Sequence, residues 1–169
     1  MIPLKDRNPT RRIPFVSSLF LHGGWLHLGG NMLYLWIFGD NVEDKLGHGR
    51  FIVFYLLTGF SASVLHIVID PGSAIPTIGA SGAISGVLGA YLLLFPGVRV
   101  LTVIPIFIFL QFVELPALVI LGFWFVMQFF NGILSLGFET SGMGGVAWWA
   151  HIGGFAAGLI LVMPFRKYQ

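Results

Sequence analysis

A serine and a histidine, each at the start of an apolar run, are the residues of this sequence whose types and spacing could do chemistry. Ser81 stands in the tetrapeptide Gly79-Ala80-Ser81-Gly82, and His151 follows Ala150. A serine hydroxyl becomes a nucleophile when a histidine beside it takes its proton as a general base. Polar groups inside apolar runs are costly to keep, so both residues are candidates for catalysis.

The composition indicates a membrane protein. Of the 169 residues, 56% are hydrophobic and only 9% are charged, whereas a soluble domain is typically about one quarter charged. The 23 glycines favour helices packed backbone against backbone, because many of them lie inside apolar runs. The absence of cysteine excludes disulfides and thiolate metal sites. A net charge of +2 is too small to indicate nucleic-acid binding.

Five apolar stretches are at or near the length of a membrane-spanning helix, which needs about 20 apolar residues. They are Ile13–Phe38, Phe51–Ile69, Gly82–Phe95, Leu115–Leu136 and Val146–Phe165. The third would be about 21 Å long in a hydrocarbon core of about 30 Å, so Ser81 at its end should lie below the membrane surface. The segment Val98–Val113 is interrupted by Pro105 and is expected to be an interfacial connector, with a sixth span as the alternative. The expected fold is an all-α polytopic membrane protein with about five transmembrane helices.

The basic residues predict an orientation in the membrane. They are Lys45 and Arg50 after the first stretch, Arg99 in the connector, and Arg166 and Lys167 at the C-terminus. We expect these segments on the cytoplasmic side and the loops 70–80 and 137–145 outside. A single domain is expected, with a basic cytoplasmic tail over 1–12, a helical core over 13–165 and a tail over 166–169. Five spans alone would put the basic N-terminal tail outside, against the charge rule. Either the tail is misplaced, or a helix that should follow Arg12 is missing.

Under this topology Ser81, His151 and His27 share one depth, about 20 Å above the inner boundary at 1.5 Å per residue. Asn31 follows His27 by one turn and lies on the same helix face. Two glycine stripes accompany the serine and the histidine. One stripe consists of Gly82, Gly86 and Gly89, and the other of Gly154 and Gly158 on the face of His151. Close contact between the two stripes would bring the imidazole to the hydroxyl.

This arrangement predicts a Ser-His dyad. His151 would take the Ser81 proton as the hydroxyl attacks a carbonyl, and would then pass it to the leaving amine. The outer-side carboxylates, Asp70 and Glu139, fall in loops, so no third member that orients the histidine is expected. Candidate oxyanion donors are the Asn31 amide, His27 and the backbone N–H of Ser81. Taken separately, Ser81 could be a packing residue and His151 a hydrogen-bonded core residue.

The motifs Gly79-Ala80-Ser81-Gly82, His27-x-x-x-Asn31 and Ala150-His151-x-x-Gly154-x-x-x-Gly158 resemble, in order and spacing, those of the rhomboid intramembrane serine proteases. The resemblance covers the chain from Pro14 to Phe165. It implies a rhomboid-like helical bundle in which Ser81 is the nucleophile, His151 the base, and His27 and Asn31 the oxyanion donors. It also implies cleavage of transmembrane proteins near their outer membrane boundary, without a cofactor or a metal.

Two features depart from the family pattern. Residues 11–16 resemble a rhomboid N-terminus that should lead into the first helix, yet they run directly into 17–22, which resembles the start of the second. We therefore expect the first helix and first loop to be absent. Ser85 stands where members often carry an aromatic ring against the base, so His151 would either be held less firmly or bond to Ser85. His22 would correspond to a structural histidine that helps order the loop above the site.

Three classes of function fit such a chain. An intramembrane serine endopeptidase is favoured, and the alternative is a catalytically inactive rhomboid-like protein that binds transmembrane clients. A small transporter is disfavoured because no charged residue lies mid-membrane. For the protease, we expect substrate to enter laterally between the first and fourth stretches, below a cap formed by the loop 137–145. The expected location is a bacterial-type cell membrane, with the C-terminus cytoplasmic.

Overall fold

The computed structural model describes residues 15–71, 78–137 and 146–167. The elements are α1 (Phe15–Ser18), α2 (Trp25–Tyr34), the π-helical turn η3 (Leu35–Gly39), α3 (Asp40–Leu46), α4 (His48–Ile69), α5 (Ser81–Leu94), β1 (Arg99–Ile106), β2 (Phe109–Pro116), α6 (Ala117–Gly137) and α7 (Trp148–Phe165). Within these residues α4, α6 and α7 are long and apolar enough to cross a membrane, and α5 is a shorter apolar helix. The expectation of a mostly helical membrane protein is confirmed.

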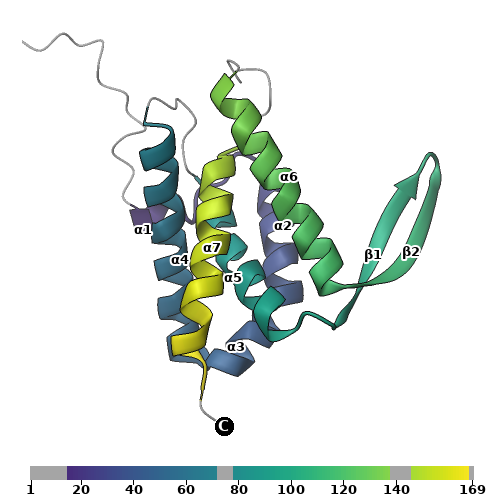
Figure 1. Cartoon of the computed structure of the whole chain (residues 1–169), viewed down its shortest axis with the longest axis horizontal. Coiled ribbons are helices and arrows are strands. Elements are labelled where there is room, and N and C mark those ends of the chain that lie inside the picture. Colours follow the sequence, from purple (N-terminus) through teal and green to yellow (C-terminus); the bar gives the residue numbers. More distant parts are fainter. Residues whose placement is uncertain (1–14, 72–77, 138–145, 168–169) are drawn as a thin grey trace, which may run out of the picture.

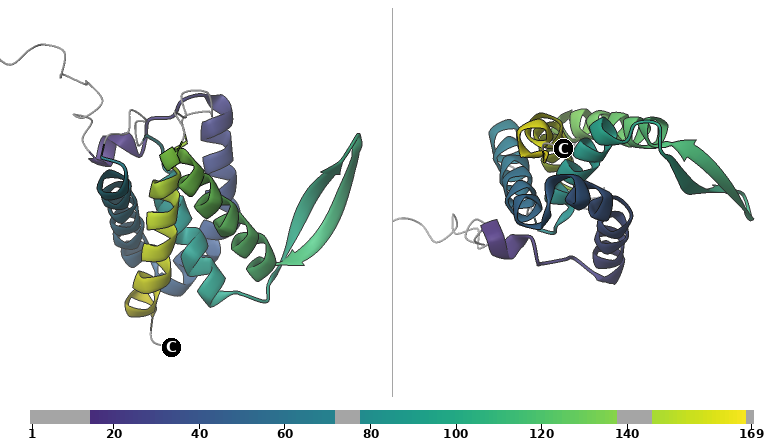
Figure 2. Two further views of the ribbon diagram at one scale, coloured as in Figure 1. Left: turned by 45° about the horizontal axis from the view of Figure 1, so that its top comes forward. Right: turned by 90° about the horizontal axis from the view of Figure 1, so that it is seen from below.

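Helix α5 lies at the centre of the bundle (Figures 1 and 2). It packs most extensively against α7 and then α4, which also pack against each other, whereas α2 contacts it only slightly. Every residue of α5 from Gly82 to Tyr91 is buried. Its 14 residues span about 21 Å, less than a hydrocarbon core of about 30 Å. A short helix suffices here because other helices, and not lipid, surround it.

Helices α5 and α7 meet backbone against backbone. A Cβ added at Gly154 would overlap the carbonyl oxygen of Gly82, and one added at Gly158 would overlap the carbonyl oxygen of Gly86. Gly89 likewise lies against the carbonyl of Phe155. The predicted stripe of Gly154 and Gly158 on α7 therefore faces the backbone of α5, as small residues do where membrane helices pack closely. The predicted stripe on α5 is divided between two neighbours, because Cβ atoms added at Gly82 and Gly86 would meet Ala62 and Thr58 of α4.

The expectation of one helix over Ile13–Phe38 is wrong, because the chain is not helical between α1 and Trp25, where α2 begins. Helix α1 ends at Ser18, and the backbone of Gly24, at φ 161° and ψ 172°, is extended. Two consecutive glycines before α2 disfavour a continuous helix, because glycine loses the most conformational freedom when it is fixed in one. Helices α2, η3 and α3 then follow one another without a break as far as Leu46.

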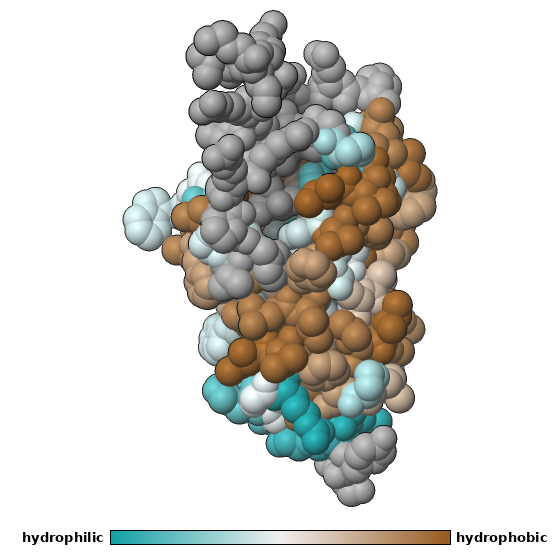
Figure 3. All heavy atoms as spheres, turned by 90° about the vertical axis from the view of Figure 1, so that its left-hand side faces the viewer, coloured by the Kyte–Doolittle hydropathy of each residue, from teal (hydrophilic) through white to brown (hydrophobic). Residues whose placement is uncertain are grey.

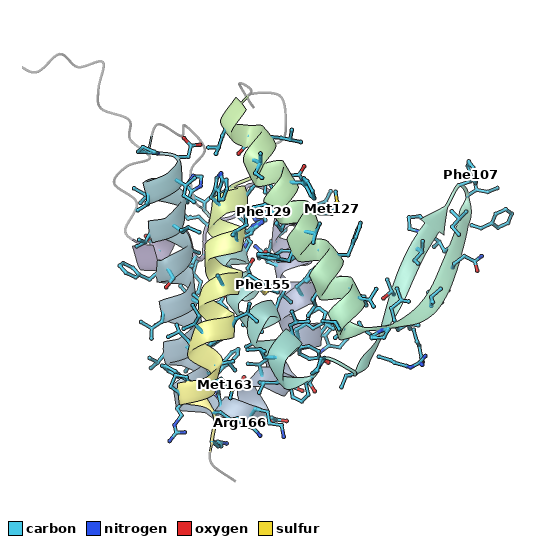
Figure 4. All side chains as sticks on the ribbon, in the orientation of Figure 1. Phe107, Met127, Phe129, Phe155, Met163 and Arg166 are labelled. Carbon is cyan, nitrogen blue, oxygen red and sulfur yellow. The ribbon has the colours of Figure 1, made fainter. Side chains whose placement is uncertain are left out.

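The connector forms an antiparallel β-hairpin and not a sixth span. Strands β1 and β2 pair from Arg99 opposite Pro116 to Ile106 opposite Phe109. The strands are rich in valine, isoleucine and phenylalanine, which favour strands, and Pro105 disfavours a helix. The hairpin projects from the bundle (Figure 1), and Phe107 extends from its tip (Figure 4). An interfacial location of this hairpin stays a prediction.

Polar and apolar residues separate along the molecule. Strongly hydrophilic residues gather at one end, and an apolar surface covers the body beside them (Figure 3). At the hydrophilic end Lys45, Arg166 and Lys167 line one hollow, and the Arg50 guanidinium donates to the Arg166 carbonyl oxygen at 3.4 Å. The basic residues after the first segment and at the C-terminus thus share one end of the bundle, as the orientation inferred from their charges requires.

Candidate active site

Ser81 and His151 lie side by side where α5 and α7 begin. The Ser81 Oγ is 2.9 Å from the His151 Nε2. Ser81 is the first residue of α5, and His151 is in the first turn of α7. Because Gly82 and Gly154 bring these two helices into backbone contact one turn or less away, the backbone itself determines the separation of the hydroxyl and the imidazole.

The second ring nitrogen of His151 is also held. Its Nδ1 lies 2.8 Å from the side-chain oxygen Oε1 of Gln128 in α6. An amide oxygen only accepts hydrogen bonds, so Nδ1 carries the ring proton and donates it to Gln128. The lone pair of Nε2 is then directed at Ser81, whose hydroxyl donates to it. No carboxylate was expected to orient the histidine, and in the described residues the partner of Nδ1 is indeed not an acid but the Gln128 amide, which the sequence did not single out.

Aromatic rings from α6 and α7 pack around the imidazole. The Trp124 ring lies 6.0 Å from that of His151 between centroids, tilted by 34°, and the Trp148 ring meets it edge-on at 6.3 Å. Ser85 donates its hydroxyl to the Ser81 carbonyl oxygen at 2.7 Å. The bond expected as one alternative between Ser85 and His151 is therefore not made, and the aromatic neighbours of His151 come from α6 and α7.

Two further polar side chains near the serine, His27 and Asn31, come from α2. The Gly23 N–H donates to the Nδ1 of His27 at 3.3 Å, which leaves the ring proton on Nε2 as a donor. Asn31 is buried, and its Nδ2 has no hydrogen-bond partner among the described residues. Gly79 has φ +105°, and a Cβ there would come within 2.8 Å of His27 Cε1. Glycine at this position therefore permits both the backbone turn and the close approach of α2.

His22 connects the segment before α2 to the same group. Its ring meets that of His27 edge-on, with 5.2 Å between centroids, and its Nδ1 lies 3.3 Å from the Phe20 carbonyl oxygen. Nearby, the Gly79 N–H donates to the Ser18 carbonyl oxygen at 2.8 Å. The chain before α2 is thus tied to the chain before α5, and a structural role for His22 stays a prediction that suits this position.

A cavity of about 580 Å³ separates α2 from the beginnings of α5 and α7. Its polar lining includes His27, Asn31, Ser81, Ser85 and His151, and its apolar lining includes Leu26, Ile84, Leu88 and Trp124. The volume falls within the range of ligand-binding pockets. The loop 138–145, expected to cap this cavity, lies outside the described residues, as do the N-terminal tail and positions 72–77. Among the described residues no cluster of three His, Asp or Glu side chains could hold a metal.

A family model described as Rhomboid domain matches residues 9–168. The chain belongs to the rhomboid family. The rhomboid protease GluP of Bacillus subtilis is 44% identical over 77 residues, 46% of this chain and 15% of that protein. Rhomboid protein 1, mitochondrial, of Saccharomyces cerevisiae is 35% identical over 96 residues, 54% of this chain and 28% of that protein. The mitochondrial presenilin-associated rhomboid-like protein of Mus musculus is 30% identical over 146 residues, 81% of this chain and 39% of that protein.

The family resemblance carried by the three motifs is confirmed, and this rhomboid is a membrane protein. It spans less than half the length of each of these three relatives. By their names, relatives are mitochondrial or chloroplastic, and GluP comes from a bacterium. A bacterial-type membrane is therefore not supported over an organellar one.

Proposed function

We propose that this rhomboid is an intramembrane serine endopeptidase that cleaves transmembrane proteins near their outer membrane boundary. The observation that carries the proposal is the contact of 2.9 Å between Ser81 Oγ and His151 Nε2 at the wall of the cavity. A hydroxyl hydrogen-bonded to an imidazole lone pair is the arrangement of a serine activated by a general base. The relationship to the rhomboid protease GluP supports the same reaction.

In the acylation step, Ser81 Oγ attacks the scissile carbonyl carbon while His151 Nε2 takes the hydroxyl proton. The carbonyl oxygen becomes an oxyanion in the tetrahedral intermediate. When the intermediate collapses, the C–N bond breaks and His151 returns the proton to the leaving amine. A water molecule then attacks the acyl-Ser81 ester with the same transfers of a proton to and from His151, which releases the second product.

Three donors suit the oxyanion. The Asn31 Nδ2 is buried and without a partner in the described part of the chain, and His27 presents Nε2–H. The third is the backbone N–H of Ser81, because the first N–H groups of a helix have no partner within it and its N-terminus favours negative charge. These donors come from α2 and α5, so binding of the oxyanion requires both helices.

Replacing Asn31 by leucine is expected to lower kcat by about 10²–10³-fold, the usual cost of removing one oxyanion donor. Leucine keeps the branched shape of the amide side chain and removes the donor, so KM should change little. Kinetics of reporter cleavage in liposomes would measure both constants. Asn41→Leu is the matched control, since Asn41 is an exposed amide in α3. A kcat equal to that of the control would exclude Asn31 from the oxyanion site.

The proposed orientation places the basic end of the bundle on the cytoplasmic side and Ser81 nearer the outer side. We further propose that substrate enters laterally between α2 and α6. Residues of both helices, Leu26 and Trp124, border the cavity. The slight contact of α2 with α5 supports this path, because α2 can move without disturbing the backbone contact of α5 with α7.

The test is cleavage of a membrane-inserted reporter by the purified chain reconstituted in liposomes. We expect a product cut near the outer boundary of the reporter's transmembrane segment, identified by mass spectrometry and absent with Ser81→Ala. A disulfide that locks α2 to α6 should block this cleavage. A reporter that is captured but never cut, with capture unchanged in Ser81→Ala, would contradict the protease and identify a client-binding rhomboid-like protein.

A further inference from the structure

Gln128 is a buried amide in the middle of an apolar helix. Its side chain is 7% exposed, and α6 has no charged residue over its length. A buried polar group is costly unless it is hydrogen-bonded, and polar groups at membrane depth are seldom incidental. The described partner of Gln128 is His151, through the 2.8 Å contact of Oε1 with Nδ1.

Helix α6 holds Gln128 in place against α7. Phe125 stacks on Phe155 with 4.7 Å between ring centroids, and Trp124 contacts both Phe155 and His151. Trp124 precedes Gln128 by four residues, so the two side chains share one helix face. The indole packs beside the imidazole ring while the amide bonds to Nδ1 of that ring. Two neighbouring residues of α6 thus contact His151 in different ways.

A neutral imidazole has two tautomers, and only one can act as the base for Ser81. The productive tautomer carries its proton on Nδ1 and presents the Nε2 lone pair to the hydroxyl. An acceptor at Nδ1 selects this tautomer and opposes rotation of the ring. A carboxylate would do the same, but a charge buried at membrane depth is costly. A neutral amide oxygen supplies the acceptor without that charge.

We propose that Gln128 is the positioning residue of the site, which holds His151 in the tautomer and ring orientation that accept the Ser81 proton. This inference rests on the proposed protease function. Throughout the cycle the Gln128 oxygen accepts from Nδ1–H, both when His151 is neutral and when it carries the second proton. Gln128 thereby occupies the place that an aspartate has in a Ser-His-Asp triad.

The kinetic test compares Gln128→Met with Gln128→Glu. Methionine has a similar length and offers no strong acceptor, whereas glutamate keeps an acceptor oxygen. We expect Gln128→Met to lower kcat for reporter cleavage by at least about tenfold, and by no more than the roughly 10⁴-fold that a wrong tautomer costs a triad histidine. KM should stay constant because Gln128 bonds to His151 from behind and does not itself line the cavity. Gln128→Glu should recover most of the loss, and the exposed Gln111→Met is the matched control.

The structural test is ¹⁵N NMR of the histidine side chains in the reconstituted protein, with His151 assigned from its absence in His151→Ala. The wild-type signal should be that of the Nδ1–H tautomer, and Gln128→Met should show a mixture with the Nε2–H form. A wild-type Nε2–H tautomer would overturn the proposal however the variants fold, since it would mean that the amide donates to Nδ1. So would a Gln128→Met variant whose kcat and tautomer both equal those of the wild type.

Failure of the protease function gives a different pattern. In that case the wild-type chain neither cleaves the reporter nor reacts through Ser81 with a fluorophosphonate probe, although the tautomer measurement still reports the contact of Gln128 with His151. Cleavage that requires Ser81 but is equal in the wild type and Gln128→Met would preserve the protease function and refute the role of Gln128. The two conclusions can therefore fail independently.

Discussion

Ser81→Ala and His151→Ala are each expected to abolish labelling of the chain by a fluorophosphonate probe while the bundle stays folded. The probe forms its bond with an activated serine Oγ, and the 2.9 Å contact to Nε2 is what activates this one. Loss of either member of such a pair lowers the rate by about 10⁶-fold in a serine protease. Both side chains border the cavity, so their truncation leaves the packed faces of α5 and α7 intact. In-gel fluorescence against total protein measures the result.

The matched controls replace a serine and a histidine elsewhere in the chain. Ser135→Ala removes a hydroxyl that bonds to the Gly132 carbonyl within α6, and His48→Ala removes an exposed imidazole at the start of α4. Both variants should be labelled as the wild type is. Persistent labelling of Ser81→Ala would show that another nucleophile reacts, and the proposed dyad would have to be abandoned.

Gly154→Ala is expected to destabilise the bundle by about 3 kcal/mol or more, at the upper end of the cost of overpacking. The new Cβ would overlap the carbonyl oxygen of Gly82, and a backbone atom cannot turn aside as a flexible side chain can. Helices α5 and α7 must therefore separate, which also pulls His151 away from Ser81. We expect a lower midpoint of thermal unfolding in detergent and loss of probe labelling in the same sample.

Gly122→Ala is the same chemical change, but it is expected to leave the stability of the bundle unchanged or to raise it. Gly122 lies in α6, and nothing lies within 4 Å of a Cβ added there. Alanine is favoured over glycine in a helix by about 1 kcal/mol, so this variant should unfold at the same or a higher temperature. Equal unfolding of Gly154→Ala and Gly122→Ala would be incompatible with backbone contact between α5 and α7.

The pairing of Ser81 with His151 could be predicted because glycines follow both residues closely in apolar runs. On α7, His151 precedes Gly154 by three residues, and the glycine face there does meet the backbone of α5. On α5 the glycines indicated close packing but not the partner, since Gly82 and Gly86 themselves lie against Ala62 and Thr58 of α4. The position of Gln128 could not be found in this way, since α6 meets α7 through aromatic side chains that allow many rotations about the helix axis. Its signal was an amide inside an apolar run, which Gln128 shares with Asn131 in the same helix.

The beginning of the first segment and the hairpin were harder to predict for different reasons. The apolar run from Ile13 continues through Gly23 and Gly24 in composition, although the backbone does not continue as a helix. Short apolar runs such as Val98–Val113 do not distinguish strand from helix by periodicity. The choice depends on whether β1 finds β2 as a partner, which is a contact between segments and not a property of either one.

The cavity also bears on how water reaches the proposed reaction. Hydrolysis of an acyl-serine consumes a water molecule in each turnover, and the hydrocarbon around α4 and α6 holds almost none. A volume of about 580 Å³ has room for on the order of twenty waters at about 30 Å³ each. Ser81 and the donors of α2 line this same cavity. In the proposed reaction the water that hydrolyses the acyl-serine would therefore come from the cavity, and a peptide segment that enters the cavity would be hydrated before it reaches Ser81.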